Sequence, residues 1–294
     1  MKLLHIVAGL EEFNGMANTA RQFAAEERAK GYESAVTNDL SALDSSVDVV
    51  LLHGAWLPIL WRAAKKARHL GVKLVIRPAG SYDPVRRAYH WWKKRLVSFF
   101  EHRMLLRADV VLATCKAEVE WIREYEPRVK KIEVTDLKRF FDLNHETHEI
   151  HERVEGRSLH LLYLGRRHPL KGVEFLEAAV KEVEGCELRI VSNAFGEEKE
   201  RVWEWCDVLI LPTLSENFGR VVAEALERGK RVITTDGAPA WGENLSRVEQ
   251  VERVEGGEML AGYGGRLIYL KGYLDGSDEK RVVLLKRAIE RVCG

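Results

Sequence analysis

The stretch VDVVLLHGAWLPILWRAAKKARHLGVKLVIRPAG, residues 47–80, contains two apolar runs with a helical pattern between them. The runs at 47–53 and 73–78 are almost continuously aliphatic, which is typical of strands buried on both faces. The apolar spacing at about 56–70 predicts a helix. A strand, a helix and a second strand in this order indicate a parallel sheet with helices on both faces.

The same alternation extends through the first half of the chain. Three further strands and three further helices are expected, the strands at 3–8, 33–37 and 109–114 and the helices at about 16–30, 87–107 and 116–124. We therefore assign residues 1–138 to a doubly wound, Rossmann-like α/β domain. Ligands of such sheets bind beyond the carboxyl ends of the strands, so the residues that directly follow a strand are the candidates for a site.

A polar stretch then separates this domain from a second one of the same class. Residues 139–158, which include NHETHEIHERVEGR, are assigned to a linker. Strands and helices alternate again after it, with strands expected at 159–165, 186–192, 206–212 and 230–235. The second domain is assigned to 159–275. A closing helix at 276–294 follows, and we expect it to pack back toward the first domain.

Length and charge limit the classes of protein that fit the sequence. The 294 residues, of which 46% are hydrophobic, suffice for two domains. Lys plus Arg (46) balances Asp plus Glu (45), so the net charge of +1 gives no general attraction to nucleic acid. Four cysteines without C-x-x-C spacing, together with the lack of a signal peptide or a long apolar segment, predict a cytoplasmic protein in a reducing compartment.

Two carboxylates follow the third predicted strand of the second domain, in SENFGRVVAEAL (215–226). Ser215 or Asn217 can cap the helix that starts here, and the N–H groups at a helix start attract anions such as phosphate. Glu216 precedes the helix, and Glu224 lies two turns into it, where a carboxylate can accept hydrogen bonds from the hydroxyls of a ribose. From spacing alone, a capped surface helix with ordinary glutamates remains an alternative.

A basic loop follows the first predicted strand of the same domain. It reads GRRHPLKG (165–172) and contains Arg166 and Lys171. Arginine offers a bidentate fork and lysine a mobile point charge, so the two can converge on one anion. Taken alone, such a loop is also typical of a solvated surface.

The carboxylate-containing segment resembles the donor signature of family 4 glycosyltransferases, also called glycosyl transferases group 1. The resemblance includes the residues on either side of the segment, which are LILPT (209–213) before it and RGKRVITTDGAPAWGE (228–243) after it. The hallmark of that family is a pair of glutamates separated by seven residues, which Glu216 and Glu224 reproduce. The resemblance implies the GT-B fold, in which two doubly wound Rossmann-like domains face each other across a cleft. It also implies retention of the anomeric configuration during sugar transfer.

The resemblance implies a role for each matching residue. Glu216, with the backbone of Asn217, Phe218 and Gly219, would hold the donor sugar, and Glu224 would bind the ribose of the nucleotide. Arg166 and Lys171 match the positions that bind the donor diphosphate. Gly15 matches the first loop, which faces the diphosphate and the acceptor in relatives. Because the sequence has no Asp-x-Asp pair, we expect departure of the diphosphate to need no metal ion and no cofactor.

The first domain departs from the family pattern at one position. RPAGSYDP (77–84) resembles a segment that usually reads Pro-His-Gly, but Ala79 stands in place of the histidine, before Gly80. His53, which ends a predicted strand and is followed by Gly54, is a candidate substitute. His53 and Gly80 are therefore candidate sugar or acceptor contacts. The alternative for His53 is a hydrogen-bonded structural residue.

Two further segments have unusual composition. Residues 86–107 contain seven Lys or Arg, one acidic residue (Glu101) and interleaved aromatic side chains. This composition indicates a helix on an anionic membrane, at the inner face and near a lipid-linked acceptor, or else a packed helix with a basic face. The spacing of His145, His148 and His151 indicates a solvated linker and no metal site.

The sequence therefore predicts a hexosyl- or related glycosyltransferase of glycan biosynthesis. It would move a sugar from a nucleotide-diphosphate sugar to a hydroxyl of a saccharide or lipid-linked acceptor. Two alternatives remain open at this point. One is a nucleotide-sugar epimerase, which can share the fold. The other is a non-catalytic protein that binds nucleotide-sugars, which Ala79 and the short stretch between the strands at 186–192 and 206–212 suggest.

Overall fold

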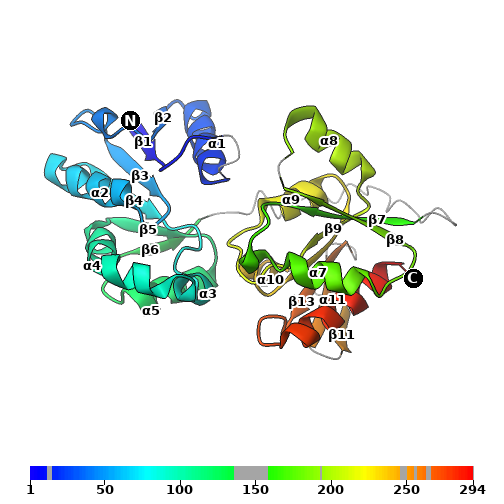
Figure 1. The fold of residues 1–294 in the computed structure, drawn as a ribbon. Helices are drawn as coiled ribbons and strands as arrows, with labels where there is room; N and C mark the ends of the chain where they lie inside the picture. Colours follow the sequence, from blue (N-terminus) through cyan, green and yellow to red (C-terminus); the bar gives the residue numbers. More distant parts are fainter. Residues whose placement is uncertain are drawn as a thin grey trace. The chain divides into compact units, whose positions relative to one another are not determined.

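The structure is a computed structural model that describes residues 1–11, 15–135, 158–192, 194–245, 250–254, 257–262 and 266–293. The chain divides into two compact units, Met1–Asp136 and Leu137–Gly294. Each unit is built around its own sheet, with helices on both faces (Figure 1). The α/β class that the sequence predicts is confirmed in both.

The first unit contains a six-stranded sheet in which every neighbouring pair of strands is parallel. The strand order is β2-β1-β3-β4-β5-β6. The strands are β1 Lys2–Ile6, β2 Glu33–Thr37, β3 Val49–His53, β4 Lys73–Arg77, β5 Val110–Ala113 and β6 Ile132–Val134. The helices are α1 Gly15–Ala29, η1 Leu40–Ala42, α2 Pro58–Leu70, α3 Pro84–Ala88, α4 Trp91–Arg107 and α5 Lys116–Tyr125.

Local sequence explains where these elements begin and end. Pro58 opens α2, where its missing N–H leaves no hydrogen bond unmade, and Gly71 ends the helix with a left-handed φ of 72°. The sequence predicts one helix over 87–107, but the structure divides it into α3 and α4. The reason is His90, whose left-handed backbone (φ 54°) cannot continue a right-handed helix.

The second unit contains a seven-stranded sheet with the order β11-β12-β13-β10-β9-β7-β8. Its strands are β7 Leu159–Leu164, β8 Cys186–Val191, β9 Val208–Leu211, β10 Arg231–Thr235, β11 Gln250–Val254, β12 Gly257–Gly262 and β13 Leu267–Lys271. Its helices are η2 Pro169–Lys171, α7 Val173–Val180, α8 Gly196–Trp205, α9 Arg220–Glu227, α10 Pro239–Glu243 and α11 Asp278–Cys293. The pairs from β13 to β8 are parallel, whereas β11 and β12 are antiparallel additions.

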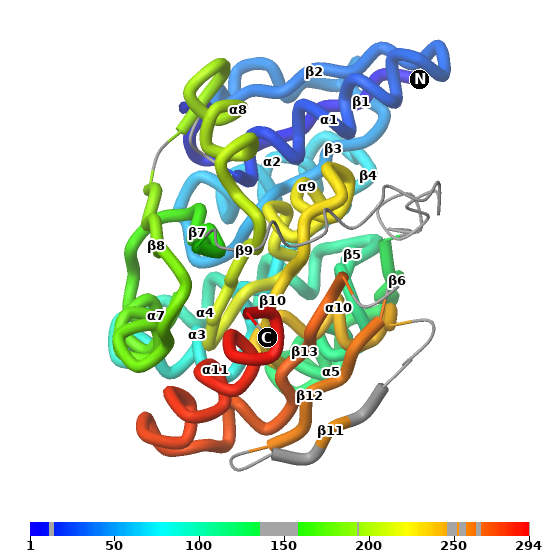
Figure 2. Tube along the Cα trace, turned by 90° about the vertical axis from the view of Figure 1, so that its right-hand side faces the viewer, coloured from blue at the N-terminus to red at the C-terminus, as the bar shows by residue number. Residues whose placement is uncertain are grey.

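The last helix belongs to the outer layer of the second unit. α11 contacts α7 and β13, and in Figure 2 it runs beside these elements. Leu284, Leu285 and Ile289 are buried on its inner face. At its C-terminal end, Arg231 donates a hydrogen bond of 3.0 Å to the carbonyl oxygen of Val292. The helix thus covers one face of this sheet.

Candidate active site

The loop after β7 leaves the strand as a tight turn. Its second residue, Arg166, accepts a hydrogen bond of 2.9 Å at its carbonyl oxygen from the Tyr163 hydroxyl. The His168 ring accepts a hydrogen bond of 3.2 Å from the Leu170 N–H and so caps η2, which ends at Lys171. Gly172 follows with a φ of 62°, and a Cβ there would lie 2.2 Å from the carbonyl oxygen of Pro212. Only glycine allows the loop to approach the end of β9 this closely.

A second loop, after β9, is hydrogen-bonded to the first through a single carbonyl group. The Leu170 oxygen accepts bonds from the Thr213 hydroxyl at 3.1 Å, the Leu214 N–H at 3.0 Å and the Ser215 N–H at 3.3 Å. These three bonds fix the two loops relative to each other. Two residues that are 45 positions apart in the sequence, Lys171 and Glu216, are thereby brought together.

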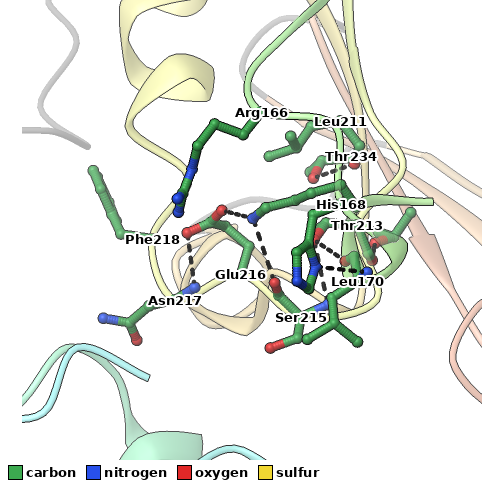
Figure 3. Close-up of polar contacts among 12 residues, drawn as sticks. Arg166, His168, Leu170, Leu211, Thr213, Ser215, Glu216, Asn217, Phe218 and Thr234 are labelled. Carbon is green, nitrogen blue, oxygen red and sulfur yellow. Dashed lines mark hydrogen bonds and ion pairs between the residues drawn. The ribbon is translucent and has the colours of Figure 1, made fainter. Parts of the chain in front are cut away.

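Lys171 and Glu216 form an ion pair between these loops. Figure 3 shows the Glu216 side chain at this point, with a dashed line for each polar contact of its carboxylate. The Lys171 ammonium also lies 3.5 Å from the carbonyl oxygen of Ser215. The Glu216 carboxylate accepts a further bond of 3.1 Å from the Asn217 N–H, and the Glu216 N–H donates to the Gly237 carbonyl oxygen at 2.7 Å. Arg166 extends toward the same carboxylate in Figure 3. The two basic and one acidic residues expected at a donor site therefore lie at one end of the second sheet.

The start of α9 is built from residues with buried or restricted conformations. Gly219 caps the helix with a φ of 62°, and a Cβ there would lie 3.0 Å from the Leu211 side chain. Phe218 is buried and stacks on Trp241, with 5.3 Å between ring centroids, and the Trp241 indole N–H donates to the Phe218 carbonyl oxygen. Trp241 therefore positions the backbone next to Glu216. Sequence reasoning assigns it no role, although it lies within the motif quoted above.

Glu224 lies on the second turn of α9 and has a lysine partner. Its carboxylate is 2.6 Å from the ammonium of Lys199, and both side chains are about a quarter exposed (24% and 28%). Lys199 lies on α8, one turn after Phe195, which is exposed at the start of that helix. Sequence reasoning does not find Lys199, because nothing in the charged run GEEKER (196–201) distinguishes it from its neighbours.

His53, at the end of β3, belongs to a buried chain of hydrogen bonds in the first unit. Its Nε2 lies 2.9 Å from Nδ1 of His5, and Nε2 of His5 lies 2.8 Å from the Glu27 carboxylate. The Ser34 hydroxyl donates to the same carboxylate at 2.7 Å. Burial, together with the positive charge of Arg77 and with His5, holds the pKa of His53 well below its usual value. The structure thus places His53 as a buried, neutral, hydrogen-bonded residue.

Which atom donates in the hydrogen bonds among His53, His5 and Glu27 follows from the Glu27 carboxylate, which can only accept when it is ionised. Burial raises the pKa of Glu27, but hydrogen bonds from His5 and Ser34 bring it below the usual value, so Glu27 is an ionised acceptor. When His5 is neutral, it donates from Nε2 and accepts at Nδ1, and His53 then donates from its Nε2. The other ring nitrogen of His53, Nδ1, is buried and has no hydrogen-bond partner among the described residues.

The segment that carries Ala79 in place of the family histidine is held by another buried carboxylate. Glu118 on α5 accepts a hydrogen bond from the Gly80 N–H and one of 2.7 Å from the Thr114 N–H. Burial raises the pKa of Glu118, and these two bonds oppose the increase. Ala79 itself has a left-handed φ of 55°, a conformation that a residue other than glycine adopts only where the surrounding structure imposes it.

Other points raised by the sequence concern Gly15, the three histidines of the linker, metal binding and a membrane-spanning helix. Gly15 is the first residue of α1, exposed, and its carbonyl oxygen accepts a bond of 2.9 Å from the Thr19 hydroxyl. His145, His148 and His151 lie outside the described residues. Among the residues that are described, no group of three or more His, Cys, Asp or Glu side chains is arranged to hold a metal ion. No described helix is both long enough and apolar enough to cross a bilayer.

Two family models match adjoining parts of the chain. Residues 34–137 match the glycosyl transferase 4-like domain, and residues 135–253 match the domain of the glycosyl transferases group 1. Together they cover most of the sequence, and the chain belongs to this family of glycosyltransferases. The resemblance inferred from the glutamate motif is thereby confirmed. A comparison with curated proteins gave no match.

Solved glycosyltransferase structures share the fold at low sequence identity. Sucrose-phosphate synthase from Thermosynechococcus elongatus has a TM-score of 0.64 at 14% identity, over 99% of this chain and 90% of its own. Anabaena HepE in complex with UDP-glucose has a TM-score of 0.60 at 14% identity, over 99% and 90%. The lipopolysaccharide outer core galactosyltransferase WaaB has a TM-score of 0.55 at 15% identity, over 100% and 92%. These similarities confirm the GT-B fold class.

Proposed function

We propose that the protein is a retaining glycosyltransferase that moves a sugar from a nucleotide-diphosphate sugar to a hydroxyl of a saccharide or lipid-linked acceptor. The observation that carries this proposal is the ion pair of Lys171 and Glu216, with Arg166 beside it, at the start of α9. A cation and an anion next to each other suit a ligand that carries a charged diphosphate on one side and sugar hydroxyls on the other.

Donor binding would proceed by an exchange of partners. The diphosphate carries more negative charge than one carboxylate, so Lys171 would move its ammonium from Glu216 to the phosphate oxygens, next to Arg166. Glu216 would then accept hydrogen bonds from hydroxyls of the donor sugar. The backbone at Asn217–Gly219 would hold the same sugar. Each group would thus have a partner both before and after the donor binds.

The transfer step would break the bond between the anomeric carbon and the diphosphate oxygen. The electron pair would leave with the nucleoside diphosphate, whose growing charge Arg166, Lys171 and the start of α9 would stabilise without a metal ion or cofactor. The acceptor hydroxyl would attack from the face that the diphosphate leaves, and its proton would pass to a phosphate oxygen. Attack on that face retains the anomeric configuration.

The nucleoside would lie between α9 and α8. Glu224 would accept hydrogen bonds from the ribose hydroxyls, with Lys199 giving up its present partner or contacting the diphosphate itself. Phe195, exposed one turn before Lys199, would present an aromatic face to the base. HepE has been crystallised with UDP and with UDP-glucose, so uridine diphosphate sugars are the first donors to test.

The acceptor and the place of action are also part of the proposal. We expect a cytoplasmic protein that works at the inner face of the membrane when the acceptor is lipid-linked, since Trp92, Leu96 and Phe99 of α4 are exposed. Gly15, at the start of α1, would face the donor diphosphate, and Gly80, after β4, would contact the sugar or acceptor. His53 would act as a positioning residue and not as a direct contact, because its side chain is buried.

One observation favours a second candidate, a protein that binds nucleotide-sugars without catalysis. Ala79 lacks the side chain with which relatives contact the donor sugar, and its backbone is held by the bond from Gly80 to Glu118. Incubation of the protein with a bound nucleotide-sugar and a range of saccharide acceptors separates the possibilities. A new glycoside supports transfer, an altered sugar on the intact donor indicates an epimerase, and an unchanged donor indicates binding alone.

A further inference from the structure

The exposed large apolar side chains of the first unit are concentrated on one helix. Five of them lie in the first ten residues of α4, where each is between 51% and 75% exposed: Trp91, Trp92, Leu96, Phe99 and Phe100. Single exposed apolar residues are common on soluble proteins and need no explanation. A contiguous group of aromatic residues on one helix is unusual and marks a contact surface.

The exposed group lies on the side of α4 that faces away from the core. Met104 and Leu105 are buried in the core of the first unit, together with the carboxylate of Glu101. With 3.6 residues per turn, Trp92, Leu96 and Phe99 share a stripe on the opposite side of the helix. α4 is therefore apolar on both its inner and its outer side, a pattern that ordinary surface helices of soluble proteins do not have.

The charges around this stripe have one sign. Lys93, Arg95 and Arg103 are exposed beside it, with the Arg103 guanidinium 5.0 Å from the centre of the Phe99 ring. The acidic residue of the segment, Glu101, points inward and accepts hydrogen bonds from the Trp56 N–H (3.0 Å), the Trp61 indole and the Tyr82 hydroxyl (2.6 Å). The outer side of α4 thus combines aromatic side chains and cations without a carboxylate.

We propose that the outer side of α4, defined by Trp92, Leu96, Phe99 and the flanking Lys93, Arg95 and Arg103, docks on a phospholipid bilayer with anionic headgroups. Tryptophan and phenylalanine insert at the boundary between headgroups and acyl chains, and arginine and lysine beside them pair with the phosphates. The whole chain is nearly neutral, so this local excess of positive charge is a property of the segment. The surface does not depend on the transfer reaction.

Sedimentation of the full chain with vesicles tests this docking surface. One set of vesicles contains phosphatidylcholine alone, and the other contains equal parts of phosphatidylcholine and phosphatidylglycerol. We expect the wild type to bind the anionic vesicles and to lose binding as salt is raised. The triple variant Trp92→Ser, Leu96→Ser and Phe99→Ser should bind at least about tenfold more weakly. Arg95→Gln and Arg103→Gln should each weaken binding about fivefold at low salt.

Matched controls distinguish a loss of membrane docking from a loss of folding and from nonspecific adsorption of exposed apolar side chains to vesicles. Tyr32→Ser with Val134→Ser removes exposed apolar side chains from other parts of the first unit, and this variant should bind vesicles as the wild type does. The triple variant should unfold thermally at the wild-type temperature or above, because its altered side chains are exposed.

Two results would overturn the proposal. One is a wild-type protein that stays in solution with anionic vesicles at low salt, or a triple variant that binds them as strongly as the wild type. The other is a wild-type protein that does not bind vesicles and forms a dimer in solution, while the triple variant stays monomeric. Light scattering would show this difference. In that case the outer side of α4 is an interface between two copies of the chain.

Discussion

Lys171, which ends the short helix after β7, and Glu216, which follows β9, neutralise each other across two loops of the second sheet. Both side chains are about a fifth exposed, at 18% and 23%, so the pair is open to a ligand. A partly exposed ion pair contributes little to stability. Its presence at a strand end is therefore better explained by the ligand it can accept than by the fold it supports.

The proposed exchange of partners predicts different behaviour for the two members of the pair. Glu216→Gln keeps the hydrogen bond from the Asn217 N–H but releases Lys171, so this variant should bind a nucleoside diphosphate at least as tightly as the wild type. Its transfer activity should nevertheless fall about 100-fold or more. Lys171→Met should lose both binding and activity. Calorimetric titration with the diphosphate, together with a transfer assay, gives both values.

Arg167 supplies the control for the charge change in the Lys171 variant. It lies in the same loop but pairs with Glu177 on α7, away from Glu216. Arg167→Met should therefore bind the diphosphate nearly as the wild type does. Equal losses in the Arg167 and Lys171 variants would mean that the loop acts only through its total positive charge.

The assignment of Glu224 to the ribose makes a prediction about fragments of the donor. Glu224→Gln should weaken binding of a nucleoside diphosphate about tenfold, because a charged acceptor of hydroxyl hydrogen bonds is replaced by a neutral amide. Binding of inorganic pyrophosphate should not change. Glu227→Gln, three residues further along α9 and exposed, is the matched control. A loss of pyrophosphate binding in the Glu224 variant would reject a ribose role.

Sequence reasoning predicts β1 to β5, β7 to β10 and the identity of the second-unit candidates, because these follow from local pattern. The carboxyl ends of parallel neighbours meet at one edge, so loops after β7 and β9 had to be close. The chain His5, Glu27 and His53 could not be foreseen, since it depends on β1 lying next to β3 in the sheet order. The role of Lys199 could not be predicted either, because neither sequence segment indicates that α8 packs near α9.

Four strands, β6, β11, β12 and β13, are not predicted, and for β11 and β12 the reason lies in their sequences. They extend the sheet as antiparallel additions beyond β13, outside the parallel core, and their sequences alternate polar with apolar residues and glycine. Such short stretches have no continuous apolar run. Strands at the edge of a sheet need fewer apolar residues than central strands, so pattern alone does not distinguish them from loops.

The buried histidine chain predicts an acid-sensitive first unit. The pKa of His53 is held well below 6.5, chiefly by burial, so the unfolded chain binds a proton that the folded protein does not. The free energy of unfolding should therefore fall as the pH drops below about 6.5. His53→Gln removes the titrating ring, and its stability should depend less on pH in this range. Urea titrations of both proteins at several pH values provide the comparison, and parallel pH profiles would contradict it.

A carboxylate at the end of α5 predicts a loss of stability in a more acidic pH range. Hydrogen bonds from Arg128 hold the pKa of Glu126 at about 2, below its ordinary 4.5, so its contribution is present above 4.5 and disappears as the pH falls toward 2. Glu126→Gln should lower the free energy of unfolding at neutral pH by about 1 kcal/mol, since Arg128 is exposed and screened. The difference from the wild type should shrink through that window. Glu124→Gln, an exposed neighbour, should show almost no difference.

The central claim is that the second unit binds a nucleotide-sugar through Arg166, Lys171 and Glu216. Thermal unfolding of the wild type in the presence of uridine, guanosine, adenosine and cytidine diphosphate sugars tests it most directly. A ligand at about 100 times its dissociation constant adds about 2.7 kcal/mol, so one of these donors should raise the midpoint by several degrees, and Lys171→Met should abolish the shift. A wild-type midpoint that stays unchanged with every donor would contradict the account.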